Sequence, residues 1–341
     1  MQPTTIGLDL AKRVFQVHAL AADGSLVCRR KLSRSELRDF FAKQPPCLVG
    51  MEACASAHYW ARELAQLGHT VRLIPAAYVK PYVKRGKSDA IDAEAICEAV
   101  TRPTMRFVPA KSVDQQAIVM LHRTRDLLVR QRTMLANALR GHLAEFGVVG
   151  ASGLWRLEQL VAMARSTSES RLPELARECI DLIVAQLEAL AERIVAAERT
   201  IHSWHRQNEA SRRLETIPGI GVITASAIAA FVTDIGGFQS ARHFAAWLGL
   251  TPRLNGTGGK VLLGHITKAG DRNLRRLLVL GATSLIHRAR INPEKAPWIA
   301  ALLSRRPARV VTVAVANKLA RIAWAVLSRG ESFRQNLTAA A

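Results

Sequence analysis

The sequence predicts an α/β domain with a mixed sheet, followed by a mainly helical remainder. In about the first 110 residues, short apolar runs alternate with helical patterns, which is typical of a sheet covered by helices. Further along the chain, apolar residues recur three, four or seven positions apart, which predicts long helices. The chain has 341 residues, of which 49% are hydrophobic, and this is enough for two or three domains with their own cores.

The first region is expected to contain a strand, a hairpin, a helix, a strand, a second helix and a further strand. Asp23 and Gly24 are typical of a hairpin turn. Ser33 and Glu36 have the spacing of a capping box that begins a helix, and Gly68 is expected to end the second helix. The strands are predicted over residues 5–10, 13–20, 25–32, 45–51 and 69–75, and the helices over 37–43 and 56–68.

The middle region carries two helical patterns separated by the polar segment 165–170. Leu121, Leu128 and Leu135 lie seven residues apart. Alternating steps of three and four, typical of a coiled-coil seam, are formed by Ile180, Ile183, Leu187, Leu190, Ile194, Ala197 and Ile201. These helices are expected either to hold subunits together or to form a helix hairpin within one chain.

The third region begins near Arg212 and contains glycine-rich turns followed by two strongly helical stretches, 270–289 and 310–330. We therefore predict three domains. They are an α/β domain over residues 1–110, a helical coiled-coil oligomerisation region over 111–208 and a mainly helical C-terminal domain over 209–341.

Composition argues against several classes of protein. No apolar run reaches about 18 residues, so no membrane span is expected. The N-terminus lacks the pattern of a signal peptide. The five cysteines are scattered and none forms a CxxC pair, which fits a reducing cytoplasm and argues against a disulfide framework or a zinc ribbon.

The net charge of +21 is unevenly spread. Residues 251–341 hold 16 Lys and Arg against 3 Asp and Glu, a surplus of 13, whereas residues 151–200 hold 6 against 8. Such a surplus indicates a polyanionic partner, most often nucleic acid. The alternative is a merely soluble basic protein.

Four carboxylates stand out against this basic background. Asp9 lies at the end of the first predicted strand and Glu52 at the end of the strand over 45–51, so these two acids are able to face each other at one sheet edge. Asp89 and Asp92 lie three apart on one face of a predicted helix, which is able to complete a cluster of four. Carboxylates this close repel one another, and a hard divalent cation with oxygen ligands, Mg²⁺ or Mn²⁺, removes the conflict. Such ions assist phosphodiester displacement.

The acids also have structural explanations. Asp9 is able to cap a turn, and Asp89 in a first helical turn is favoured by the helix dipole, with Ser88 as the N-cap. Glu52 is harder to explain in this way, because an acid after a buried strand needs a partner. Basic residues before the helix are expected to steer a phosphate backbone toward the cluster, unless they form only a solvated loop: Lys80, Lys84, Arg85 and Lys87.

Seven longer segments carry a more specific signal. They are IGLDLAK, GMEACASAHYWARELAQLGH, VRLIPAAYVKPYVKRGKSDAIDAEAICEAV, QRTMLANALRGHLAEFG, IPGIG, WLGLTPR and GGKVLLGHITKAGDRNLRRLLVLGA. Together they resemble the DEDD-type insertion-sequence transposases, also called bridge-RNA-guided recombinases and related to the Piv and MooV invertases. The resemblance is nearest to the 1111 subgroup of insertion-sequence family 110 and runs from about residue 5 to about residue 330.

The resemblance implies an N-terminal RuvC-like (RNase H-type) domain, a coiled coil and a C-terminal transposase domain. It maps the acidic tetrad of the family, which binds metal, onto Asp9, Glu52, Asp89 and Asp92. It also implies a homodimer that assembles to a homotetramer, donor and target double-stranded DNA, and a structured noncoding guide (bridge) RNA whose base pairing supplies specificity.

The second catalytic element of the family is a serine in a loop after GLTPR, and this chain has Thr257 at that position. Threonine is a competent nucleophile, although its methyl group crowds the approach and restricts χ1. Thr257 is therefore the nucleophile, a slower nucleophile or a replacement that stalls the reaction, and a plain glycine-rich turn is the structural alternative. Its glycine neighbours Gly256, Gly258 and Gly259 let a backbone come close to a phosphate.

Other polar residues have simpler interpretations. Thr224 and Ser226 are expected to be packed, Ser240 to be a helix N-cap, and His58 and His265 to have structural or hydrogen-bonding roles. Phosphate binding, with plain surface charge as the alternative, is expected for Lys260, Lys268, Arg272, Arg275 and Arg276.

We therefore expect an RNA-guided DNA recombinase that cuts and rejoins the strands of an insertion sequence and its target. The reaction is expected to pass through a covalent link at Thr257, assisted by Mg²⁺ at the tetrad. The alternatives are a metal-dependent junction nuclease without a covalent intermediate and a catalytically impaired nucleic-acid-binding protein. The active site is built within one subunit or across two, and the resemblance favours two. A bacterial cytoplasmic, nucleoid-associated location is expected.

Overall fold

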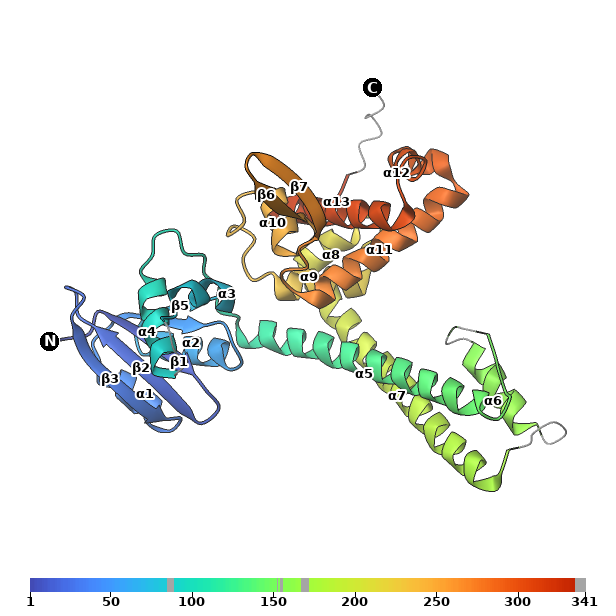
Figure 1. Cartoon of the computed structure of the whole chain (residues 1–341), viewed down its shortest axis with the longest axis horizontal. Coiled ribbons are helices and arrows are strands. Elements are labelled where there is room, and N and C mark those ends of the chain that lie inside the picture. The colour runs from blue at the N-terminus through green and yellow to red at the C-terminus, as the bar shows by residue number, and fades with distance from the viewer. Residues whose placement is uncertain (85–88, 152, 154–155, 167–171, 335–341) are drawn as a thin grey trace. The chain divides into compact units, whose positions relative to one another are not determined.

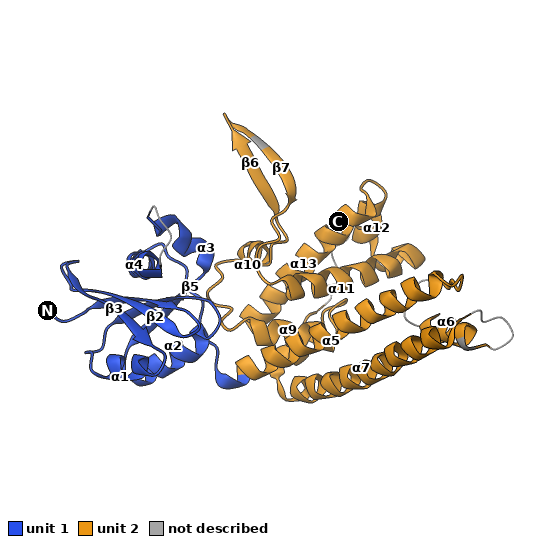
Figure 2. Cartoon of the chain, turned by 60° about the horizontal axis from the view of Figure 1, so that its bottom comes forward, with its two compact units in different colours: residues 1–114 blue, residues 115–341 orange. Residues whose placement is uncertain are grey.

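The computed structural model describes residues 1–84, 89–151, 153, 156–166 and 172–334 (Figure 1). The chain forms two compact units, Met1–Asp114 and Gln115–Ala341 (Figure 2). The division into three domains stays a prediction.

A five-stranded sheet forms the centre of the first unit, in the order β3-β2-β1-β4-β5. Its strands are β1 (Thr5–Leu10), β2 (Val14–Leu20), β3 (Leu26–Ser33), β4 (Leu48–Glu52) and β5 (Thr70–Ile74). The first three strands are antiparallel neighbours, whereas β4 pairs in parallel with both β1 and β5. The predicted mixed sheet is therefore confirmed, and the α/β architecture is consistent with a RuvC-like domain.

Helices cover both faces of this sheet. They are α1 (Glu36–Ala42), α2 (Ala57–Gln66), α3 (Ala76–Val79) and α4 (Asp89–Val100), with the 3-10 turn η1 (Lys80–Tyr82). The large side chains Ile6, Leu8 and Met51 pack in one core with residues of α1 and α2. Because side chains alternate along a strand, the opposite face presents the intervening residues, and α4 covers that face (Figure 2).

Local signals in the first unit are mostly confirmed. Gly68 has a φ of 92° directly after α2, a conformation that favours glycine. The Glu36 carboxylate accepts hydrogen bonds from the backbone N–H (2.7 Å) and hydroxyl (2.6 Å) of Ser33. The N-cap of α1, however, is Ser35 rather than Ser33. Only the half of the capping box that Glu36 supplies is therefore present.

Two long antiparallel helices, α5 (Val113–Ala144) and α7 (Glu174–Gln207), lie side by side (Figures 1 and 2). The predicted seam on α7 faces the interior of this chain, since Ile180 and Leu187 share a core with Leu139 of α5. The Arg125–Glu198 ion pair (2.5 Å) adds a polar link between the two helices. The seam is therefore used within one chain. Helix α6 (Leu157–Arg165), which the sequence did not predict, shares that core, and most of the predicted polar linker lies outside the described residues.

The rest of the second unit is mainly helical, as predicted. Its elements are α8 (Glu209–Glu215), α9 (Val222–Phe231), α10 (Ala241–Trp247), β6 (Pro252–Thr257), β7 (Lys260–Ile266), α11 (Arg272–Ile291), η3 (Pro293–Lys295), α12 (Pro297–Leu303) and α13 (Ala308–Arg329). The β6–β7 hairpin was not predicted, because its glycines indicated only turns.

Among the described residues, one helix, α13, bears on the expectation that the chain has no membrane span. This helix is long and apolar enough to span a membrane by length and composition. Val311, Leu319 and Ala323 are nevertheless buried in the core that α13 shares with α9, α10 and α11. Packing of this kind is ordinary for a core helix, so α13 is weak support for a membrane span.

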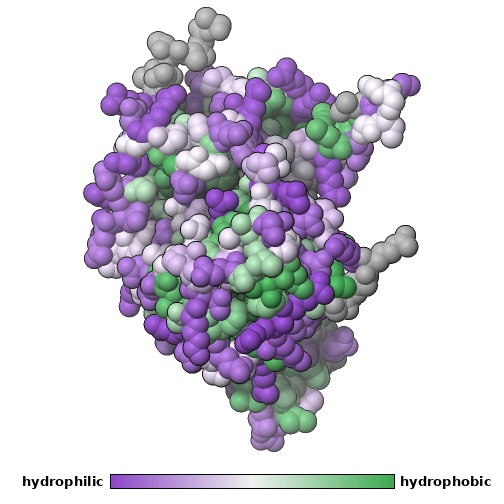
Figure 3. All heavy atoms as spheres, turned by 90° about the vertical axis from the view of Figure 1, so that its left-hand side faces the viewer, coloured by the Kyte–Doolittle hydropathy of each residue, from purple (hydrophilic) through white to green (hydrophobic). Residues whose placement is uncertain are grey.

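Hydrophilic residues cover most of the face shown in Figure 3, with hydrophobic patches between them. Two elements carry several large exposed apolar side chains. On α5 these are Val113, Met120, Leu127 and Met134, each seven residues from the next. On the β6–β7 hairpin they are Leu254, Leu262 and Leu263. Several large exposed apolar side chains on one element are a feature of interaction sites.

Candidate active site

Two of the predicted acids lie at the carboxyl ends of adjacent parallel strands. The register of β1 and β4 pairs Gly7 with Gly50 and Leu8 with Met51. Asp9 and Glu52 take the next position on each strand, two residues beyond the glycines. Because residues two apart point to the same face, both acids share the face that bears the glycines.

The paired glycines allow α4 to lie directly on the sheet. A methyl group added to Gly7 would lie 2.1 Å from the carbonyl oxygen of Ala93 and 2.5 Å from the amide nitrogen of Cys97. One added to Gly50 would lie 2.8 Å from Cβ of Val100. Any larger residue would displace the helix. The two glycines hold the middle and the end of α4 against the sheet, and the first turn of the same helix then lies beside the strand ends.

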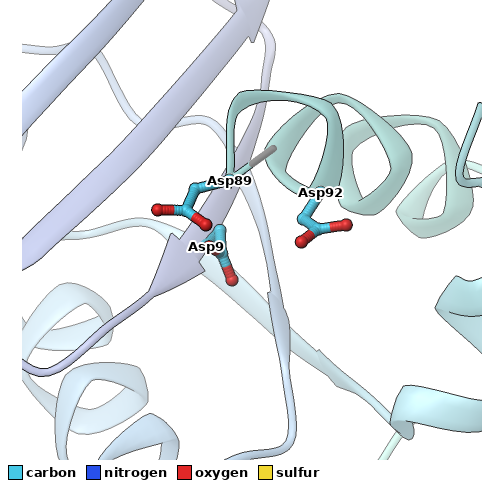
Figure 4. Close-up of side chains that lie close together, drawn as sticks. All are labelled: Asp9, Asp89 and Asp92. Atoms are coloured by element: carbon cyan, nitrogen blue, oxygen red, sulfur yellow. The ribbon is translucent and has the colours of Figure 1, made fainter. Parts of the chain in front are cut away.

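This arrangement brings three of the four predicted acids together. Asp9, Asp89 and Asp92 each offer a carboxylate oxygen, and these oxygens all lie within 4.8 Å of one another (Figure 4). Glu52 is not a member of that trio, although it lies near enough for its charge to act on Asp9. Chain segments about 80 residues apart in sequence thus form one acidic cluster, with Glu52 at its margin.

The electrostatics of the cluster are unfavourable for the bare carboxylates. Burial, followed by the charges of Asp92, Asp89 and Glu52, raises the pKa of Asp9 from its ordinary value of 3.8 to about 6. Burial and the charge of Asp92 also raise the pKa of Glu52. The electrostatic repulsion between the carboxylates is therefore strongest at the strand ends, at Asp9 and Glu52.

The donor set fits a hard divalent cation. All the donors are carboxylate oxygens, which is the chemistry that Mg²⁺ and Mn²⁺ prefer. Among the described residues, no Lys, Arg or His forms an ion pair with Asp9, Glu52, Asp89 or Asp92. A bound cation would remove a repulsion that the described part of the chain leaves uncompensated.

The basic residues before α4 have different surroundings. Lys84 forms an ion pair with Glu94 (2.5 Å), and Arg29 reaches the same carboxylate at 3.2 Å. Lys80 is exposed in η1. Arg85, Lys87 and the predicted N-cap Ser88 lie outside the described residues.

Sequence reasoning missed Gly7 and Gly50, which position α4. A signal was present, since glycine precedes the acid by two residues in both GLD (7–9) and GME (50–52). It also missed Cys54 and Ser56 in the loop after β4. Cys54 lies near enough to the cluster that Glu52 and Asp9 raise the pKa of its thiol, after burial as the larger cause. Ser56 has a φ of 69°, which no pattern in the sequence indicated.

Thr257 belongs to the second unit, at the tip of the β6–β7 hairpin. It pairs with Lys260 across the two-residue turn Gly258–Gly259, whose φ values of 55° and 78° require glycine. Thr257 is exposed, and nothing lies within 4 Å of a methyl group added to either glycine of the turn. The Thr257 hydroxyl therefore lies at an open tip of the hairpin, which another molecule is able to approach closely.

The basic residues after Thr257 divide into two groups. The Arg275 guanidinium donates to the carbonyl oxygens of Leu248 (3.1 Å) and Ala269 (2.7 Å), and Arg276 pairs with Asp126 (2.5 Å). The side chains of these two arginines therefore make contacts within the fold. Lys260, Lys268 and Arg272 are exposed.

The simpler interpretations of other polar residues agree with the structure where it describes their contacts. Thr224 and Ser226 are buried, and the Ser226 hydroxyl donates to the carbonyl oxygen of Val222 (2.6 Å). Ser240 caps α10 by accepting from the His243 N–H. His58 accepts a hydrogen bond from the Lys111 backbone N–H (3.2 Å), and His265 is exposed on β7.

A mixed sheet with clustered carboxylates at parallel strand ends, in a strongly basic chain, fits the class of enzymes that act on nucleic-acid phosphodiesters. Comparison with known families shows which family within this class the chain belongs to. The family described as "Transposase IS116/IS110/IS902 family" matches residues 211–298, and a DEDD transposase family of IS110 elements, described as "Transposase", matches residues 6–147. The chain belongs to the IS110 family of DEDD transposases.

Similar proteins cover almost the whole chain. A "Probable family 20 transposase" of Pseudomonas aeruginosa is 51% identical over 98% of this chain and 99% of its own length. The "Transposase for insertion sequence element IS1328" of Yersinia enterocolitica is 43% identical over 97% and 98%. The "Transposase for insertion sequence element IS1111A" of Coxiella burnetii is 38% identical over 96% and 91%. The chain is therefore a DNA transposase, an enzyme of DNA recombination, and DEDD transposases generally use divalent metal ions.

Proposed function

We propose that this transposase cuts and rejoins DNA strands of an insertion sequence and its target by a covalent mechanism. In this proposal Thr257 is the nucleophile, and Asp9, Glu52, Asp89 and Asp92 hold Mg²⁺ or Mn²⁺. The observation that carries it is the gathering of three carboxylates from β1 and α4 within 4.8 Å. A divalent cation bound there would orient the phosphate and stabilise the charge that develops on it.

The covalent step uses the Thr257 hydroxyl. Its oxygen Oγ1 forms a bond to the phosphorus while the bond from phosphorus to the leaving strand oxygen breaks. The hydroxyl proton is released and the leaving oxygen gains one, so the phosphodiester energy is kept in the threonyl phosphoester. Attack by the hydroxyl of a second strand reverses the step and joins the new strands. Phosphate contacts by Lys260, Lys268 and Arg272, all exposed, would hold the DNA near Thr257.

The partners proposed are donor and target duplexes, a guide RNA and further copies of the chain. The guide RNA rests on the family resemblance, and so do the nucleoid location and an active site built from two subunits. For the homodimer, which is proposed to assemble to a homotetramer, the exposed stripe Val113, Met120, Leu127 and Met134 on α5 offers a seam, because heptad spacing aligns these residues along one side of the helix.

The test is a suicide DNA substrate whose cleavage product cannot be rejoined. The wild type is expected to form an adduct that survives denaturation in the presence of Mg²⁺, and Asp9→Asn is expected to form none. Thr257→Ala is expected to bind DNA like the wild type without forming an adduct. An adduct that persists in Thr257→Ala would remove Thr257 from the mechanism. Cleavage without any adduct would favour a junction nuclease, and DNA binding without cleavage would favour a catalytically impaired protein.

A further inference from the structure

The β6–β7 hairpin has a closely packed base, formed by residues 249–251 and 267–270. Its two strands, which we call the blade, are exposed over residues 253–260 and 262–265. At the base, a methyl group added to Gly249 would lie 2.4 Å from backbone atoms of Ala269, and one added to Gly270 would lie 2.0 Å from the carbonyl oxygen of Trp247. Lys268 has a φ of 56°, and its N–H donates to the carbonyl oxygen of Gly249 (3.1 Å). The Asn317 side chain donates to the carbonyl oxygen of Leu250 (3.2 Å), which ties the base to α13.

The blade extends away from the helices of its unit (Figure 2). Leu254, Leu262 and Leu263 are 73%, 71% and 70% exposed. An isolated two-stranded hairpin is marginally stable in water. The exposure of three leucines to water is also unfavourable in free energy. A protruding hairpin with this composition is therefore expected to be covered by a partner when the protein is at work.

The strand register sorts the blade into two faces. Leu254 pairs with Leu263, so the two side chains share one face. Thr257 pairs with Lys260, and Asn255 with Leu262, on the opposite face. The face with the reacting hydroxyl is therefore mostly polar, whereas the other presents a pair of leucines.

Charge decides which partner fits. The sequence has no Asp or Glu between Asp234 and Asp271, whereas Arg253, Lys260 and Lys268 lie in that interval. Two copies of this hairpin packed against each other would bring like charges together. A polyanion would be attracted, and the chain belongs to a family of DNA transposases.

We infer that the β6–β7 hairpin enters the major groove of duplex DNA, with Leu254 and Leu263 against the base edges and the tip of the hairpin, which carries Thr257, beside a sugar–phosphate strand. The major groove is about 12 Å wide and admits a two-stranded ribbon. Leucine side chains there contact thymine methyl groups, and Arg253 and Lys260 are positioned to flank phosphates. This inference rests on the proposed role of Thr257 and adds a DNA-contacting surface to it.

The spacing gives a position for the contact. Leu254 lies three residues from Thr257 along β6, which is about 10 Å in a strand. DNA rises about 3.4 Å per base pair, so the contacted bases would lie at most about three base pairs from the phosphate that Thr257 attacks, the limit for a hairpin parallel to the DNA axis.

Photocrosslinking of the full chain tests the inference. The variant Leu263→p-benzoylphenylalanine is mixed with labelled short duplexes of random sequence and irradiated. Leu280→p-benzoylphenylalanine on α11, where the leucine is 54% exposed, is the matched control. The expected result is a protein–DNA crosslink from position 263 only. No crosslink, a crosslink between two protein copies, or equal crosslinking from position 280 would overturn the inference.

Affinity measurements give a second readout. The double variant Leu254→Ala Leu263→Ala is expected to bind DNA roughly tenfold more weakly, with an unchanged salt dependence. Lys260→Ala is expected to reduce the slope of log K against log salt by about 1. Wild-type affinity for the double variant would overturn the inference.

The adduct assay separates this inference from the proposed function. A threonyl–DNA adduct without a crosslink at position 263 would leave the proposed function intact and remove the groove contact. A crosslink at position 263 without an adduct would leave the groove contact intact and remove the proposed covalent mechanism.

Discussion

Among the acids of the cluster, Asp9 is the one whose ionisation burial and neighbouring charges oppose most. It lies on a strand that the core holds in place, and its neighbours Asp89, Asp92 and Glu52 add negative charge. In the unfolded chain the carboxyl titrates near its ordinary value of 3.8, whereas folding raises the pKa to about 6. Folding is therefore opposed increasingly as the pH rises from about 4 to about 6, and above about 6 the penalty is complete.

This penalty predicts a pH-dependent difference between the metal-free wild type and Asp9→Asn. The variant lacks the ionising group, so its Tm is expected to exceed that of the wild type above about pH 6 and to match it near pH 4. Thermal unfolding across that pH range measures the difference. A gap that does not change with pH would contradict the raised pKa.

Mg²⁺ supplies a second measurement on the same pair. Binding to the folded state is expected to raise the Tm of the wild type at neutral pH, and Asp9→Asn is expected to gain much less. Chelation should return the wild type to its metal-free Tm. Equal gains for both proteins would place the cation elsewhere.

Thr257 allows a prediction about rate. Replacing threonine by serine removes the methyl group that crowds the approach of the phosphate and restricts χ1. If Thr257 is the nucleophile, Thr257→Ser is expected to form the covalent adduct at least as fast as the wild type, whereas Thr257→Val should form none. The time course on a suicide substrate distinguishes these outcomes, and an active Thr257→Val protein would refute the role.

At the scale of elements, the close approach of α4 to the sheet decides where two of the acids lie. Gly7 and Gly50 are opposite each other on β1 and β4, and neither leaves room for a Cβ atom. The helix is therefore held near the strands along much of its length. The acids at its first turn depend on that packing as much as on their own sequence.

Gly7→Ala is expected to destabilise the fold by about 3 kcal/mol, because overpacking forces the backbone of α4 to shift. The shift moves Asp89 and Asp92 away from Asp9, so Mg²⁺ affinity should fall as well. Urea unfolding and a metal titration measure the two effects. The control is Gly141→Ala on exposed α5, where nothing lies within 4 Å and the substitution should stabilise by up to about 1 kcal/mol. Unchanged metal affinity in Gly7→Ala would contradict this positioning role.

At the scale of the whole molecule, the heptad seam predicted on α7 and the exposed apolar stripe on α5 are formed by different residues. The α7 seam packs within the chain, in cores that include α5 residues. The exposed heptad stripe on α5 is the seam proposed above for a second copy. The proposed assembly would therefore use side chains of α5 that the sequence analysis did not single out.

Leu127→Glu Met134→Glu is expected to shift the protein toward monomer in sedimentation velocity, because charges at a paired seam repel and lose apolar burial. Far-ultraviolet circular dichroism should remain unchanged, since both positions are exposed. Leu280→Glu on α11 is the control and should keep the oligomeric state of the wild type. An unchanged distribution in the double variant would place the interface on another surface.

The sequence by itself determined the order of strands and helices in the first unit, the positions of the acids on them and the family. Apolar periodicity and long ordered motifs are local properties, so one chain displays them fully. The sequence left open whether the α7 seam lies within or between chains. Signals for α6 and for the hairpin were present but not used: the helical spacing of Leu157, Leu160, Val161 and Ala164, and the Gly258–Gly259 pair. Heptad spacing shows that a helix needs a partner without saying which one.

Only the tertiary structure decided that Asp9, Asp89 and Asp92 form the tight trio while Glu52 borders it, and that Arg275 and Arg276 are used inside the fold. These outcomes depend on how closely two elements approach. Gly7 and Gly50 set that distance for α4, through contacts between residues about 50 to 90 positions apart that no local pattern specifies.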